Sequence, residues 1–265
     1  MLRLVALLLL TLSSACSVSP ERLLFSLDLP GATKQVILCT TDDWQDSTAT
    51  VRCLERKNGG WQVVVPKQQS GLTQPGEQDQ PGRLSFPANV GRSGLGWGLG
   101  MHVDGAGPKK REGDGRAPAG IFSLGTAFGY AATPPAGMTV PYRQATDRDY
   151  FVDAPAAPAY NQWQHIPAAQ ANDPTSRWAS CERMRRDDAL YEWGMVVNHN
   201  TRPVVPGRGS AIFLHVWLGA GKPTSGCTSM SRSDLLRVMA WLRADATPLL
   251  VQMPVGELAA LRRRY

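Results

Sequence analysis

Short apolar runs separated by turns rich in glycine and proline dominate the first half of the chain, which indicates strands joined by loops. Strands are expected at residues 35–41, 49–56, 61–65 and 121–124. Residues 67–89 are polar without a sustained period and are expected as an exposed loop. Segment 91–100 has glycine at almost every second position and is expected as a hairpin or a loop close to a substrate.

The second half of the chain mixes irregular, helical and strand-like patterns. Residues 131–172 carry no sustained period and are expected to be irregular, whereas 177–190 are expected to be helical. Strands are expected at 194–198, 211–214 and 249–253, the second of them buried on both faces. From Ser231 the spacing becomes helical, with Ser231 as the cap and Asp234 three residues later. The sequence therefore predicts a mainly β domain with a few helices.

The first residues have the order of a secretory signal. Arg3 precedes an apolar run at 4–12, which is too short for a permanent membrane span, and small residues follow at 13–15. Ala15-Cys16 also resembles a lipoprotein cleavage box, although Ser13 and Ala15 equally suit ordinary signal peptidase. We expect a signal peptide at 1–15, a tether at 16–34, a catalytic domain at 35–254 and a tail at 255–265. The protein is then exported to the periplasm or cell envelope, with Cys16 as the candidate lipid anchor in the outer membrane.

The net charge of +6 suits an anionic polymer such as a cell wall, and it also suits solubility alone. Nucleic acid is not an expected partner, because no basic run is interleaved with aromatic residues. No cofactor is expected either, since segment 91–100 has no Gly-Lys-Ser/Thr after it and no acidic partner of a dinucleotide site.

The cysteines of an exported chain invite disulfide pairing. Cys39 and Cys53 lie in neighbouring apolar runs and could face each other across a hairpin, so we expect a bridge between them. Cys227 then remains a thiol, and Cys181 is left unassigned.

His215 ends an apolar run, and Gly226-Cys227 follows shortly before the predicted helix. A histidine can take the thiol proton, which makes the cysteine a nucleophile. The glycine permits a tight turn and the approach of a carbonyl, and backbone N–H groups near a helix start can hold an oxyanion. Taken by themselves, a strand-end histidine and a cysteine before a helix are also common structural residues.

Two motifs resemble the L,D-transpeptidase catalytic domains of the YkuD type. That family carries a histidine, a gap of similar size and then Ser-x-Gly-Cys before a helix, which His215, Gly226 and Cys227 match. Residues 110–120 resemble the Glu-Gly-Asp…Thr-Pro-Glu-Gly signature of one branch. The resemblance covers roughly residues 35–254 and is thin between 133 and 178. It implies a β-sandwich or barrel with a helix after the catalytic cysteine.

The resemblance implies that Cys227 attacks a peptidoglycan stem peptide and forms a thioester, with His215 as base and then acid. An amine on a second stem or on a protein resolves the thioester, giving a cross-link or an anchored protein. Ser225 and Gly226 would help to stabilise the oxyanion. Substrate contacts are expected from a further set of residues: Trp217, Thr228, Ser229 and Arg116. Ser210 and Asn198 are the candidate partners that orient His215.

Departures from the family pattern keep alternatives open. Ser225 replaces the usual histidine, and Thr228-Ser229 follow the cysteine where an apolar residue and Arg or Asn are usual. The same fold would serve a peptidoglycan L,D-carboxypeptidase or amidase, and a decayed site would leave a non-catalytic wall-binding lipoprotein. A zinc hydrolase is disfavoured because His-x-His and His-Glu-x-x-His are missing. A papain-like peptidase is disfavoured because its cysteine precedes its histidine. The oligomeric state stays open.

Overall fold

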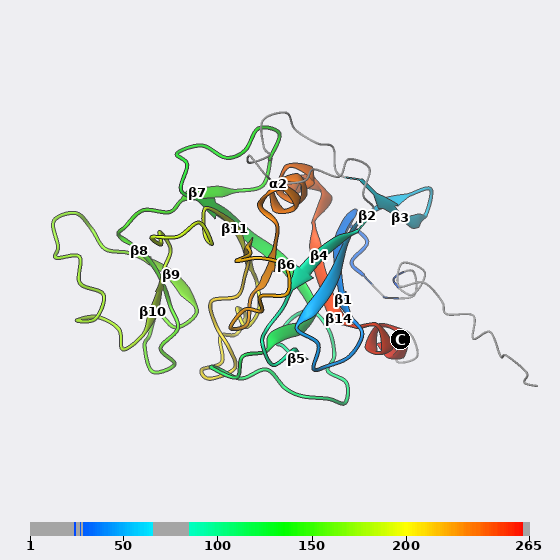
Figure 1. The fold of residues 1–265 in the computed structure, drawn as a ribbon, viewed down its shortest axis with the longest axis horizontal. Helices are drawn as coiled ribbons and strands as arrows, with labels where there is room; N and C mark the ends of the chain where they lie inside the picture. Colours follow the sequence, from blue (N-terminus) through cyan, green and yellow to red (C-terminus); the bar gives the residue numbers. More distant parts are fainter. Residues whose placement is uncertain (1–23, 25–26, 28, 66–84, 262–265) are drawn as a thin grey trace, which may run out of the picture.

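The computed structural model describes residues 24, 27, 29–65 and 85–261 (Figure 1). The expected signal peptide and the candidate lipidation site Cys16 lie outside these residues, as does most of the expected loop at 67–89. No helix in the described part is both long and apolar enough to cross a bilayer.

The main sheet closes on itself. Its order is β1-β14-β6-β11-β12-β13-β4-β2, and β2 also pairs with β1, so the strands form a barrel. β3 continues from β2, whereas β5 and β7 pair with β6. The strands are β1 Gln35–Thr41, β2 Thr48–Lys57, β3 Gly60–Val64, β4 Phe86–Asn89, β5 Leu95–Trp97, β6 Ala117–Gly129, β7 Tyr142–Gln144, β8 Asp149–Val152, β9 Gln162–His165, β10 Cys181–Arg183, β11 Trp193–Val197, β12 Phe213–Val216, β13 Thr228–Met230 and β14 Leu249–Pro254.

Strands that are apolar throughout form the centre of the barrel. Every residue of β1, β12 and β14 is buried, as their continuous apolar runs predict. β1 pairs in parallel with β14, and β12 in parallel with β13, while the other barrel pairs are antiparallel. Closure leaves the barrel strands without an open edge, so their backbone groups are paired and their inward side chains fill the core.

Two helices pack on the described barrel. α2 (Arg232–Trp241) begins after β13, with Ser231 as its N-cap: the Ser231 hydroxyl accepts from the Asp234 N–H at 3.1 Å. α3 (Val255–Leu261) follows β14 directly and contacts it. The expected mainly β fold with a helix after Cys227 is therefore confirmed.

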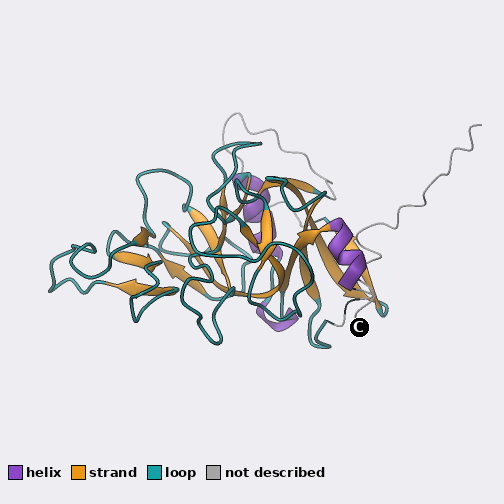
Figure 2. Cartoon of the chain, turned by 90° about the horizontal axis from the view of Figure 1, so that it is seen from below, coloured by secondary structure: helices purple, strands orange, loops and turns teal. Residues whose placement is uncertain are grey.

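A separate three-stranded sheet, in the order β10-β8-β9, lies at one end of the elongated molecule (Figures 1 and 2). Asp149 at the start of β8 is its anchor: the buried carboxylate accepts from Arg143, Trp163 and Thr146 and contacts His165. Burial works to raise the pKa of Asp149, but the hydrogen bonds with Thr146, Trp163 and His165 outweigh it and hold that pKa below its ordinary value.

Two expectations about this region are wrong. Residues 177–190 form no helix: β10 pairs with β8 there, and turns occupy the rest. Only Met184 is buried within 177–190, so the segment has no apolar face to pack as a helix. Residues 131–172 are not irregular throughout, because β7, β8 and β9 lie within them.

The predicted disulfide between Cys39 and Cys53 is not formed, and both are buried free thiols. The register of β1 and β2 places Cys39 opposite Val51 and Cys53 opposite Ile37. The two cysteines are diagonal neighbours, and such Cα atoms lie about 7–8 Å apart. Disulfides usually need Cα atoms within about 6.8 Å.

Both flanks of the expected catalytic domain contribute to packing. Leu24, Leu27 and Leu29 are buried although they lie in the segment expected as a tether. In the expected tail, Leu258 of α3 is fully buried.

Removing the cap of α2 should destabilise the domain. We expect Ser231→Ala to lower the free energy of unfolding by about 1 kcal/mol, because the Asp234 N–H loses its acceptor. Ser231→Thr keeps a hydroxyl and should lose less. Urea denaturation of both variants and the wild type measures this difference, and equal stability of Ser231→Ala and wild type would contradict the capping role.

Candidate active site

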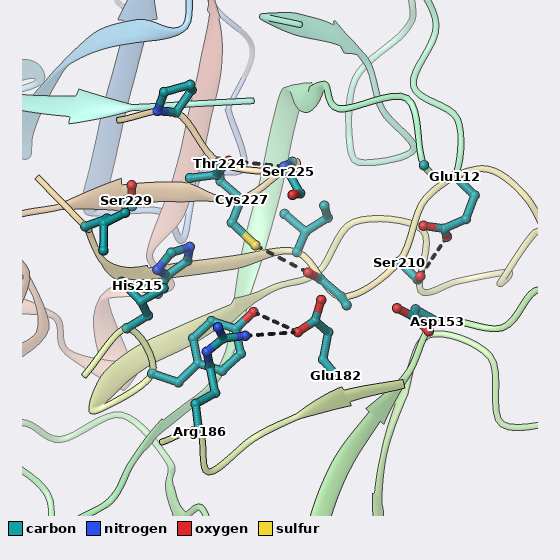
Figure 3. A pocket seen from close by; sticks show the side chains of 18 of the residues that line it. Glu112, Asp153, Glu182, Arg186, Ser210, His215, Thr224, Ser225, Cys227 and Ser229 are labelled. Carbon is teal, nitrogen blue, oxygen red and sulfur yellow. Dashed lines mark hydrogen bonds and ion pairs between the residues drawn. The ribbon is translucent and has the colours of Figure 1, made fainter. Parts of the chain in front are cut away.

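A pocket of about 390 Å³ opens between the barrel and the three-stranded sheet. Figure 3 shows Cys227 and His215 on its barrel side and Asp153, Glu182 and Arg186 across from them. The expected catalytic residues Ser225, Gly226, Cys227 and His215 all line this pocket. The structure thus brings together what the sequence separates, and their catalytic roles stay predictions.

The parallel pairing of β12 and β13 sets the geometry of the pair. His215 lies opposite Ser229, and Leu214 lies opposite Thr228. Because side chains alternate along a strand, Cys227 and Ser229 share one face with Phe213 and His215. The Cys227 sulfur confirms this placement, since it accepts from the Phe213 N–H at 3.4 Å.

The thiol donates to the carbonyl of Ala211 at 3.4 Å. Ala211 has φ 51°, a left-handed conformation that costs energy for a non-glycine residue. Buried Asn161 holds it there: its Oδ1 accepts from the Ala211 N–H, and its Nδ2 donates to the carbonyls of His199 and Asn200. The Ala211 carbonyl, which accepts the hydrogen bond of the thiol, is therefore held in place by hydrogen bonds that join Asn161 to the segment 199–211.

His215 is oriented by its own strand. Its Nδ1 lies 2.7 Å from the Val216 carbonyl, so this nitrogen carries the proton and Nε2 is the basic one. The Tyr191 ring packs edge-on against the imidazole, with centroids 5.3 Å apart. The expected partners are wrong: Ser210 donates to Glu112, and Asn198 donates to Ser123.

Burial keeps both members of the pair neutral at rest. It raises the pKa of Cys227 to about 12, against the hydrogen bond from Phe213. It lowers the pKa of His215 to about 4, against the Val216 carbonyl and with help from the charge of Arg186. The resting state at neutral pH is a thiol beside a neutral imidazole, which is a base without its proton.

The turn before the cysteine is closed by Thr224. Its hydroxyl donates to the Cys227 carbonyl at 2.6 Å and accepts from the Gly226 N–H at 3.1 Å. Gly226 has φ 156°, and a Cβ there would lie 3.1 Å from the Arg116 carbonyl oxygen. The positive φ and the close approach to the Arg116 carbonyl therefore both favour glycine here, and its N–H is already bonded within the turn.

Of the expected substrate-binding residues, the structure places one in the pocket. Ser229 lines it, and its buried hydroxyl has no hydrogen-bond partner. Thr228 points to the other face of β13 and donates to Gln252, while Arg116 donates to the carbonyls of Leu95 and Trp44. Trp217 is not among the lining residues. These positions do not support substrate contacts by Thr228, Arg116 or Trp217.

Charged residues of the pocket were missed from the sequence. Lys110 and Glu112 lie in the motif at 110–120, and both line the pocket. The residue pattern of that motif does not indicate which of its side chains face Cys227. Glu182 lies in β10, Asp153 directly follows β8 and Arg186 lies in the segment after β10, and no sequence motif marks these three residues. Burial and the nearby Asp153 raise the pKa of Glu182. Only the folded structure shows that these charged side chains line the same pocket as Cys227.

The other buried histidines belong to the core. His102 packs against Trp97 and Phe122, and His199 accepts from the Leu99 N–H. Within the described residues, no three His, Cys, Asp or Glu side chains gather as a metal site.

A family model described as the L,D-transpeptidase catalytic domain, YkuD, matches residues 63–253, most of the chain. The chain belongs to the YkuD family. The suspected relationship is thereby confirmed, and it supports a peptidoglycan-acting function of the L,D-transpeptidase type.

Comparison with other proteins adds little to the YkuD assignment. One solved structure, the helical cell shape determining protein Pgp2 from Campylobacter jejuni, is 11% identical with a TM-score of 0.35. The match covers 86% of this chain and 53% of Pgp2, so the chain spans about half of that protein's length. No curated protein matches the chain.

The rate at which Cys227 is alkylated should depend steeply on pH. With a Cys227 pKa of about 12, the thiolate is only on the order of 10⁻⁵ of the total at pH 7. In the protein without substrate, alkylation of Cys227 by iodoacetamide should therefore rise about tenfold per pH unit from pH 7 to 10. Peptide mass mapping separates Cys227 from the half-buried Cys181. A plateau near neutral pH would instead reveal a preformed thiolate–imidazolium pair.

Proposed function

We propose that this protein is an exported cysteine acyltransferase that acts on peptidoglycan stem peptides through a Cys227 thioester. The supporting observation is the placement, in one pocket of a YkuD domain, of a thiol and a neutral imidazole whose Nδ1 bonds the Val216 carbonyl and leaves Nε2 as the basic nitrogen. His215 Nε2 takes the thiol proton as the sulfur attacks, then gives it to the leaving amine. An amine of a second stem or of a protein resolves the thioester.

Export is the second part of the proposal and rests on the sequence. The apolar run at 4–12 and the small residues at 13–15 support a signal peptide, and Cys16 supports a lipid anchor in the cell envelope. An extracytoplasmic protein would meet the peptidoglycan that YkuD domains act on.

Products of a defined substrate test the reaction. Incubation with purified tetrapeptide-bearing muropeptides, followed by mass analysis, should give cross-linked dimers with wild type and none with Cys227→Ala. Trimmed monomers without dimers would show a carboxypeptidase or amidase of the same fold. Unchanged muropeptides would support a non-catalytic wall-binding protein and overturn the proposal.

The identity of the nucleophile has its own test. A carbapenem should add its full mass to the wild-type protein, because Cys227 opens the β-lactam and keeps the acyl group. Cys181→Ala is the matched control, a half-buried thiol outside the pocket, and should still form the adduct. An adduct on Cys227→Ala would show that another residue is the nucleophile.

A further inference from the structure

Lys110 is a buried cation at the edge of the site. Its side chain is 3% exposed and lines the pocket of Cys227. The backbone fixes its position, since the Lys110 N–H donates to the Trp97 carbonyl at 2.9 Å. Burying an ammonium is costly unless its donors are satisfied, so the position of this lysine requires a reason.

Two of its three N–H donors are committed within its own loop. Nζ donates to Asp114 Oδ1 at 2.6 Å and to the Arg111 carbonyl at 2.7 Å. Asp114 is fixed in turn, because it accepts from the backbone N–H groups of Arg111 and Arg116. A lysine ammonium has three donors, so one N–H remains beyond these two bonds.

The ammonium lies beside the turn that carries the nucleophile. A Cβ on Gly226 would be 3.8 Å from Lys110 Nζ, and the glycine places no side chain between them. Burial raises the pKa of Cys227, and the positive charge of Lys110 acts in the opposite direction and lowers it. Glu182 acts on the same thiol in the opposite direction.

Acyl transfer creates negative charge at this point. When Cys227 adds to a carbonyl, the C–S bond forms, the C=O π pair moves to oxygen, and the thiol proton passes to His215 Nε2. Collapse restores the C=O bond and expels the amine, which takes that proton. Because the Gly226 N–H already donates to Thr224, it is not a free donor for the oxyanion.

We propose that Lys110 is a further catalytic residue, whose ammonium stabilises the oxyanion formed on addition of Cys227 to the substrate carbonyl. The inference rests on the proposed role of Cys227 as nucleophile. This role explains the motif at 110–116, in which Asp114 and the Arg111 carbonyl hold the Lys110 ammonium in place. Because Gly226 has no side chain, nothing at that position separates the ammonium from the oxygen of the substrate carbonyl.

The test compares two reactions of the same sulfur in Lys110→Met/Asp114→Asn, which removes the cation without leaving its carboxylate unpaired. Carbapenem acylation passes through an oxyanion, whereas iodoacetamide is displaced directly at carbon. Relative to Asp114→Asn alone, we expect acylation at pH 9 to fall about 100-fold. Alkylation of Cys227 should change less than about fivefold, which also reports that the pocket is intact.

Lys109→Met is the matched control, since the Lys109 ammonium pairs with Asp104 and does not line the pocket. It should acylate as wild type does. With muropeptides, the Lys110 variant should lose kcat while KM stays within about twofold.

Several results would overturn the inference. Acylation and alkylation falling together would mean that Lys110 acts only through the thiol, and a raised KM with unchanged kcat would mean that it binds substrate.

Full muropeptide turnover by the Lys110 variant would refute the catalytic role of Lys110 and leave the proposed function standing. Carbapenem acylation that depends on Lys110, without turnover of muropeptides by wild type, would refute the proposed substrate alone. A wild-type protein that resists both would refute both.

Discussion

The site depends on the parallel pairing of β12 with β13. That pairing is one of the two parallel pairs in the barrel, and it sets His215 opposite Ser229. Because side chains alternate along a strand, a slip of one residue would turn Cys227 away from the imidazole. Every residue of both strands is buried, so a shifted pairing would force all of their side chains to repack.

The same burial sets the chemistry. Removing water from the thiol and the imidazole favours their neutral forms and leaves a base beside an acid that has not yet lost its proton. The Ala211 carbonyl accepts from the thiol, and Asn161 holds Ala211 in a left-handed conformation. The Cys227 thiol is thus neutral at rest, and any charge that forms on it would arise in a pocket that already contains fixed charges.

The sequence predicts elements that depend on their own residues. β1 has the expected bounds because its apolar run is continuous, and Ser231 caps α2 because the capping pattern is local. β6 is far longer than the expected strand at 121–124, since its glycines and small residues hide the pattern. Cys227 and His215 line one pocket, as their motif indicates, and their catalytic roles stay predictions. Ser210 and Asn198 are not the partners of the imidazole, because that partner is a backbone carbonyl that no side-chain pattern shows.

The sequence does not show which charged side chains come together around Cys227. Lys110 comes from the loop before β6, while Glu182 lies in β10 of the second sheet and Arg186 in the segment that follows it. Their effects on Cys227 differ in sign: Lys110 and Arg186 favour the thiolate, and Glu182 opposes it. A site built in this way separates two tasks. The barrel fixes the positions of Cys227 and His215 through strand register, and the surrounding loops and the second sheet supply the charges around them. Substitutions in the second sheet can therefore retune the charge around the thiol while the pairing of β12 and β13 stays unchanged.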